Sequence, residues 1–285
     1  MNGTEDVSVS PVASEVLGAA VVVAFDVRAV EASGAGRAID LEVLEVLKGR
    51  VASAPGDRVV VEVEVHSNAD LWGTVTVGDR YVAYCDASST DLRVLLQPAH
   101  CAQLAIDRAA GVLEDVRLVR SVQNRHLVAD QLLGTAEARR ATAGPVFARY
   151  LWVAAREALR TSSERFARLM AVAQDAATRV DAQEAYLVSA YEDLTFSEAF
   201  PEQDRVLLVR TMLASALDPR LGALRERLLG TYVPNLVRLP LPRPLTPGEV
   251  FSAEDDLRDA LRAELADDRD PATTSPALAD WLGVS

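Results

Sequence analysis

The side chains that most often carry chemistry are few in this sequence and lie far apart. The three histidines are His66, His100 and His126, and the two cysteines are Cys85 and Cys101. None of them forms a His-x-x-x-His or Cys-x-x-Cys pair, which are spacings that present two ligands to one metal ion. The sequence therefore predicts no metal site.

His100 and Cys101 are neighbours in the sequence, but their side chains do not point the same way on an extended segment. We therefore expect a buried thiol beside a surface imidazole rather than a nucleophile with its base. Cys85 and Cys101 both lie near one predicted hairpin. They would pair as a disulfide in an exported protein, whereas reduced thiols are expected in the cytosol.

Other catalytic and cofactor motifs are missing from the sequence. It contains no Gly-x-Ser-x-Gly elbow, no phosphate-binding loop and no dinucleotide fingerprint, so we predict no catalytic residues and no cofactor. Two acidic clusters lie near the end of the chain, at residues 254–256 and 267–270. The first suits the start of a helix, and the second lacks the glycine and the distal glutamate of a calcium loop.

Two groups of residues are candidates for a binding surface. The first is Asp70, Leu71 and Trp72, because a tryptophan in a polar loop can anchor a partner. The alternative is that Trp72 packs over one end of the first domain. The second group consists of arginines in the predicted helices, which either bind a partner or dock onto the acidic first domain: Arg139, Arg140, Arg165 and Arg168.

Charge is distributed unevenly along the 285 residues, whose formal net charge is −13. Residues 1–106 carry 7 basic and 15 acidic side chains, residues 107–180 carry 12 and 8, and residues 181–285 carry 10 and 19. Acidic surfaces are repelled by phosphate backbones, so nucleic-acid binding would depend on the middle segment alone. Solvated helix faces explain those arginines better, and an unidentified protein partner is expected instead.

The sequence indicates no membrane segment, because its longest apolar stretch, residues 16–25, is too short to cross a bilayer. The first fifteen residues contain acidic side chains but no lysine or arginine, unlike a secretory signal. We therefore predict a cytoplasmic location, or an exported one if a signal has been removed.

Residues 1–106 have the pattern of a small β domain. Apolar runs at 21–27, 39–47, 59–65, 80–85 and 92–96 are separated by turns rich in glycine, proline and aspartate. Five short strands without a long helix between them predict an antiparallel sheet closed into a barrel, because closure removes exposed edges. A helical turn at 12–17 is expected to plug one end.

Residues 107–285 have a helical period and predict an all-α domain, either a bundle or an irregular array of helical hairpins. Thr161-Ser162-Ser163-Glu164 and Asp181-Ala182-Gln183-Glu184 have the pattern of capping boxes. A proline-rich segment at 234–248 predicts an extended connector. The expected helices lie at 113–132, 136–160, 163–178, 182–194, 202–217, 221–230, 248–266 and 275–282.

The β domain resembles the netrin-like modules related to tissue inhibitors of metalloproteinases. The resemblance rests on the strand and glycine turn from Val21, the stretches 41–49 and 55–59, and Val77-Gly78-Asp79-Arg80-Tyr81-Val82-Ala83-Tyr84. It covers residues 12–106 and implies an OB-type barrel. These inhibitors clamp the protease zinc with an amino-terminal cysteine, and nothing near Met1 matches it.

These observations favour a non-enzymatic protein that binds other proteins or acts as a scaffold. An inhibitor or regulator of a protease or another effector, acting through the barrel, is the alternative. A weaker alternative is an enzyme whose site is assembled at the domain junction from residues distant in sequence.

Overall fold

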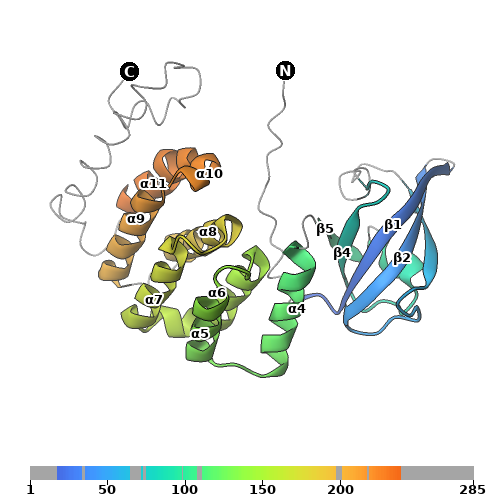
Figure 1. Cartoon of the computed structure of the whole chain (residues 1–285), viewed down its shortest axis with the longest axis horizontal. Helices are drawn as coiled ribbons and strands as arrows, with labels where there is room; N and C mark the ends of the chain where they lie inside the picture. The colour runs from blue at the N-terminus through green and yellow to red at the C-terminus, as the bar shows by residue number, and fades with distance from the viewer. Residues whose placement is uncertain are drawn as a thin grey trace, which may run out of the picture. The chain divides into compact units, whose positions relative to one another are not determined.

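The chain folds into a β-rich part followed by a helical part. The computed structural model describes residues 18–33, 36–64, 72, 75–97, 99–107, 111–196, 201–216 and 218–238. Its contacts divide the chain into two compact units, Met1–Leu127 and Val128–Ser285 (Figure 1). Helix α4 (Gly111–Asn124) belongs to the first unit, whereas the sequence placed the domain boundary before it, between residues 106 and 107.

The described strands of the first unit form one antiparallel sheet in the order β3-β2-β1-β4-β5. They are β1 (Val21–Ser33), β2 (Gly36–Lys48), β3 (Arg58–Glu64), β4 (Arg80–Cys85) and β5 (Cys101–Ile106). Among these strands, β3 and β5 are the two edges and do not pair with each other, so the prediction of a closed barrel is wrong. Bulges between β1 and β2 bend the sheet locally without closing it.

The segment predicted as the fifth strand, residues 92–96, is instead a short helix, α3 (Leu92–Leu95). Asp91 caps it by accepting a hydrogen bond of 2.9 Å from the Arg93 amide. Leu92, Leu95 and Leu96 all lie in the core, a spacing that fits a helical turn better than a strand. The helix contacts β3, one of the two edges that a barrel would have to join.

One face of the sheet encloses the core of the first unit. Alternate residues of β1 and β2 are buried there, including Val23, Phe25 and Leu41. On β3, the strand next to this hairpin, Val60 and Glu62 are exposed, which is the alternation that the sequence predicts.

The opposite face of the central strands is also buried, which explains the continuous apolar run at the start of β1. Val22 and Tyr84 are fully buried although they do not point into the main core. Helix α4 lies against β2, where Arg117 Nε donates to Glu45 at 2.9 Å and Arg120 Nε donates to the Leu47 carbonyl at 3.1 Å.

The end of β2 requires glycine at position 49. Gly49 has a φ of +79°, and a Cβ added there would lie 2.5 Å from the carbonyl oxygen of Ala20. The Lys48-Gly49 pair therefore ends the strand, as predicted, because no other residue fits this turn without displacing the start of β1.

The second unit is built of helices that pack on both their first and their second neighbours along the chain. Helix α6 lies against α8, α5 against α7, and α7 against α9, and α5 also lies against α6 and α7 against α8. Contacts of both kinds are typical of helical hairpins that stack on one another. The described elements are α5 (Ala129–Arg139), α6 (Pro145–Arg160), α7 (Ser163–Gln174), α8 (Val180–Phe196), α9 (Glu202–Ala216), η2 (Pro219–Leu221), α10 (Gly222–Arg227), η3 (Leu228–Tyr232) and α11 (Val233–Arg238).

Several predicted boundaries in the helical region are wrong. The expected helix at 113–132 is broken into α4 and α5, with His126 between them at a φ of 50°. Pro145 starts α6, so the expected helix at 136–160 is also two. Residues 233–238 form α11, although the sequence predicted an extended connector from residue 234.

Other predictions fall on residues that are not described. These are the helical turn at 12–17, the remainder of the connector at 239–248, the acidic clusters and the helices at 248–266 and 275–282.

Among the described helices, none has both the length and the hydropathy needed to cross a membrane.

Candidate functional site

The structure places Trp72 inside the first unit rather than on its surface. Its side chain is 2% exposed, and its ring stacks on Phe25 with the centroids 6.4 Å apart. The Trp72 carbonyl accepts a hydrogen bond of 3.3 Å from Arg37. The indole is therefore not available to a partner in this conformation, because it packs within the core of the first unit. Asp70 and Leu71 lie outside the described residues.

Arg165 and Arg168 of α7 point at acidic side chains of the neighbouring helix α5. Arg165 donates to both carboxylate oxygens of Asp130, at 2.9 and 2.8 Å. Arg168 makes the same fork with Glu137, at 2.9 and 3.1 Å. The hydrogen bond from Arg165 is the main cause that lowers the pKa of Asp130 below its ordinary value. These arginines thus connect two helices of one unit.

Arg139 and Arg140 end α5, and the structure gives them different surroundings. Arg139 is exposed. Arg140 Nε contacts Asp175, which lies in the connection between α7 and α8, at 2.8 Å. The carbonyl of Arg140 accepts from the Arg179 amide at 3.1 Å, and the Arg179 guanidinium donates to the Thr142 carbonyl at 3.4 Å. Arg140 therefore helps to join the connection between α5 and α6 to the connection between α7 and α8.

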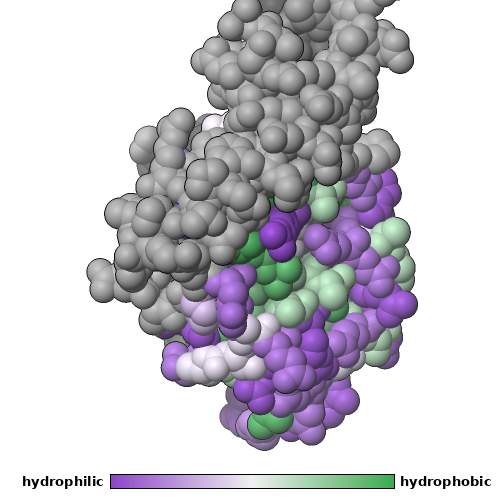
Figure 2. Space-filling model, turned by 90° about the vertical axis from the view of Figure 1, so that its left-hand side faces the viewer, coloured by the Kyte–Doolittle hydropathy of each residue, from purple (hydrophilic) through white to green (hydrophobic). Residues whose placement is uncertain are grey.

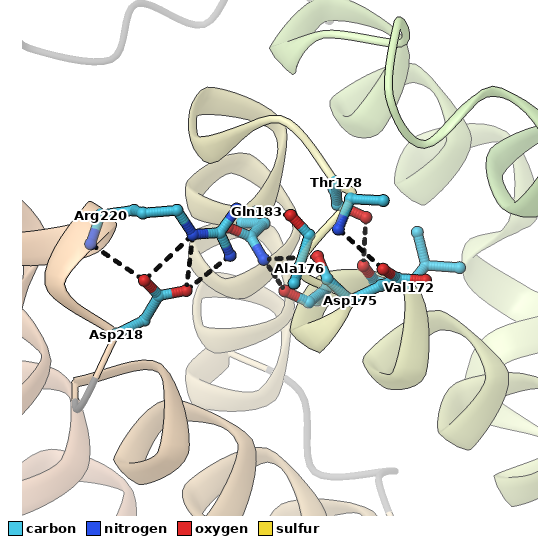
Figure 3. Close-up of polar contacts among 9 residues, drawn as sticks. Val172, Asp175, Ala176, Thr178, Gln183, Asp218 and Arg220 are labelled. Atoms are coloured by element: carbon cyan, nitrogen blue, oxygen red, sulfur yellow. Dashed lines mark hydrogen bonds and ion pairs between the residues drawn. The ribbon is translucent and has the colours of Figure 1, made fainter.

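A similar link joins the connection between α7 and α8 to the segment that follows α9 (Figure 3). Arg220 is held by Asp218 at 2.6 Å and reaches back to the Ala176 carbonyl at 2.6 Å. Gln183 Nε2 donates to the carbonyl of Asp175 at 3.1 Å. The turns of consecutive hairpins are thus linked along one edge of the unit, and their charged residues have a structural explanation.

The starts of α7 and α9 are joined by a buried carboxyl group. Asp204 is 1% exposed, and burial raises its pKa, an effect that a hydrogen bond with Ser163 partly opposes. Ser163 Oγ also accepts a hydrogen bond of 2.6 Å from Gln203. This contact fixes the two helices at one end of their interface.

A further polar and aromatic group lies on α8, the end of α10, η3 and α11. We call it the tyrosine cluster. Its five members are Glu184, Tyr191, Arg227, Tyr232 and Asn235. The two tyrosine rings are tilted against each other with centroids 4.4 Å apart, and the Arg227 guanidinium carbon lies 5.6 Å from the centre of the Tyr232 ring. A cation over an aromatic ring is an attractive contact.

Hydrogen bonds fix the geometry of the tyrosine cluster. Arg227 donates to the Tyr232 hydroxyl through Nε at 3.2 Å and Nη2 at 2.7 Å, and its Nη1 donates to Glu184 at 3.0 Å. Asn235 Nδ2 donates to the Tyr191 hydroxyl at 2.9 Å. In these contacts both hydroxyl oxygens are acceptors, which leaves the hydrogen of each hydroxyl to donate to another group.

The cluster depends on the π-helix η3. Arg227 and Tyr232 are five residues apart, a spacing that does not align side chains on an α-helix. The wider turn of a π-helix brings residues i and i+5 together, and short π-helical turns often occur at functional sites. The sequence prediction ended this helix at residue 230, so it left Tyr232 unplaced and missed the cluster.

The tyrosine cluster is accessible from solvent. The Arg227 side chain is 43% exposed and that of Glu184 is 23% exposed. Asn235 is exposed, and both tyrosines are half-buried. Half-buried aromatic rings with fixed polar partners are the kind of surface that anchors a protein ligand.

Hydrophobic side chains form a second surface feature, a band bordered by hydrophilic ones on the face shown in Figure 2. No described contact indicates what this band binds, so we assign it no partner.

The histidine and cysteine residues do not form a metal site in the described part of the chain. No group of three or more His, Cys, Asp and Glu side chains converges there. His100 Nδ1 lies 3.0 Å from Asp86, while Cys101 is buried, so the two neighbours point apart as predicted. His66 is outside the described residues.

Comparisons with protein-family models, curated proteins and solved structures find no match to this chain.

Proposed function

We propose that this protein is a non-enzymatic interaction protein, with the helical unit as its binding platform and the tyrosine cluster as the contact surface. The observation that carries the proposal is the accessible pair of tyrosines held in place by Arg227 and Asn235. Side chains fixed before binding lose less conformational entropy when a partner arrives.

The composition of the cluster supports a protein ligand. Tyrosine and arginine are enriched among the residues that contribute most to protein interfaces. The hydroxyl hydrogens of Tyr191 and Tyr232 suit an acceptor such as a backbone carbonyl or a carboxylate. Stacked helical hairpins present extended surfaces of this kind.

Quantitative capture from native cell extract tests the proposal. The baits are the full chain, the variants Tyr232→Ala and Asn235→Ala, and Val153→Ala as the control, because Val153 of α6 is 48% exposed and lies outside the cluster. Each variant is checked for an unchanged circular dichroism spectrum. We expect Tyr232→Ala to lose its specific partner by roughly 10-fold or more, as hot-spot truncations do. Val153→Ala should bind like the wild type. Equal capture by Tyr232→Ala and wild type would contradict the proposal.

Further measurements would favour the other hypotheses: capture with variants of the first unit, and an assay of turnover. A partner that is a protease, and that is lost by changes in the first unit but retained by Tyr232→Ala, would favour a regulator acting through the sheet. Turnover of a small molecule by the full chain would favour an enzyme.

A further inference from the structure

Two reduced cysteine thiols face each other across neighbouring strands of the first unit. Cys85 at the end of β4 and Cys101 at the start of β5 are direct partners in the strand register. Each is 1% exposed, and their side chains are joined by a hydrogen bond. Residues opposite each other in an antiparallel pair are close enough for a disulfide when their side chains share one face.

The chain between these two cysteines contains α3, which fills one side of the core. Leu92, Leu95 and Leu96 are 0% exposed. At the base of this loop, the Asp86 amide donates to the His100 carbonyl at 3.0 Å. A covalent bond between the cysteines would close the loop next to that hydrogen bond and would reduce the freedom of α3 to leave the core.

We propose that Cys85 and Cys101 form a reversible cross-strand disulfide that locks α3 onto the core of the first unit. The oxidant is a small-molecule disulfide such as oxidised glutathione. One cysteine thiolate attacks a sulfur of the reagent, the reagent S–S bond breaks, and one thiol leaves. The second cysteine thiolate then attacks the mixed disulfide and expels the second thiol. Two electrons pass from the protein sulfurs to the reagent, and the two protein protons end on the two released thiols.

The surroundings of the cysteines set the rate of this reaction. The hydrogen bond with Cys101 and burial raise the pKa of Cys85, so little thiolate forms in the closed structure. Among the described strands β5 is an edge and pairs only with β4, so its separation from β4 is the opening that exposes both thiols. Oxidation is therefore slow in the folded protein and faster during refolding.

The test uses the full chain incubated with oxidised glutathione, both folded and during refolding from denaturant. Alkylation and intact mass measure the thiols, and hydrogen exchange follows residues 86–97. We expect the loss of two hydrogens in mass, a monomer on a non-reducing gel, and slower exchange at 86–97. The melting temperature of the first unit should rise by roughly 10 °C. Dithiothreitol should reverse the change in mass, the slower exchange and the rise in melting temperature.

Single variants provide the controls. Cys85→Ala and Cys101→Ala should each form only a mixed disulfide with glutathione and show no slower exchange at 86–97. The proposal is overturned if both thiols of the wild type stay free after refolding with the oxidant, or if the oxidised product is a dimer.

Discussion

The two units of this protein use their polar and aromatic side chains in opposite ways. In the first unit, Trp72 and the two cysteines lie inside one core. In the second, arginines connect neighbouring helices, and Tyr191 and Tyr232 are partly exposed. In the first unit, Trp72 and the cysteines, which the sequence singled out for possible chemistry or binding, are therefore part of the core. In the helical unit, a separate aromatic group is partly exposed, and it is the contact surface that we propose.

The largest effect should come from removing the indole of the first unit. Trp72→Ala deletes a side chain that is 2% exposed and stacked on Phe25. Truncation of a buried tryptophan costs about 3–5 kcal/mol because it removes apolar contacts and leaves a cavity. Urea unfolding of the first unit measures this loss. A stability within about 0.5 kcal/mol of wild type would place Trp72 on the surface.

The helical assignment of α3 predicts a difference between adjacent residues. Leu95→Ala should lower the free energy of unfolding by about 2–5 kcal/mol, because Leu95 is 0% exposed. Val94→Ala is the matched control, since Val94 is 40% exposed and should change stability by less than about 0.5 kcal/mol. Equal losses from the two changes would contradict this packing of α3.

The connections between α5 and α7 should contribute less than the core of the first unit. Arg165→Ala breaks the fork with Asp130, and we expect a small fall in the melting temperature of the helical unit. The fall should shrink as salt is added, because the pair is exposed to solvent. Thermal melts at low and high salt measure both effects. A double-mutant cycle with Asp130→Ala isolates the pair, and additive effects would show that it contributes nothing.

The smallest expected effect is a dependence on pH at the base of the α3 loop. Hydrogen bonds from the side chain and backbone of Ser88, and then from His100, lower the pKa of Asp86 from 3.8 to about 2. The carboxylate therefore stabilises the folded state above pH 3.8, and this contribution is lost as the pH falls through about 2. Asp86→Asn should be less stable than wild type at pH 5, with a difference that narrows toward pH 2. A difference independent of pH would contradict this role of Asp86.

The fold could be predicted where local pattern and packing agree. The β1–β2 hairpin was identified from its apolar runs and glycine turn, and α3 was not, because the run Leu92-Arg93-Val94-Leu95-Leu96 fits a strand or a helix equally well. The break between α4 and α5 contains neither proline nor glycine, and His126 supplies the positive φ there. Sheet closure depends on contacts distant in sequence, which no local pattern reports.

The candidate site could not be predicted for a related reason. Arg165 and Arg168 have the same sequence pattern whether they face solvent or Asp130 and Glu137 of another helix. Tyr191 and Tyr232 meet only because α8 lies beside η3 and because η3 is a π-helix. Neither condition is visible in the spacing of the residues.

Hydrogen exchange of the full chain, with and without its captured partner, tests the central claim most directly. If the tyrosine cluster is the contact surface, the partner should slow exchange in the peptides that contain residues 184–191 and 227–235. Protection confined to the first unit, with these two stretches unchanged, would contradict the account.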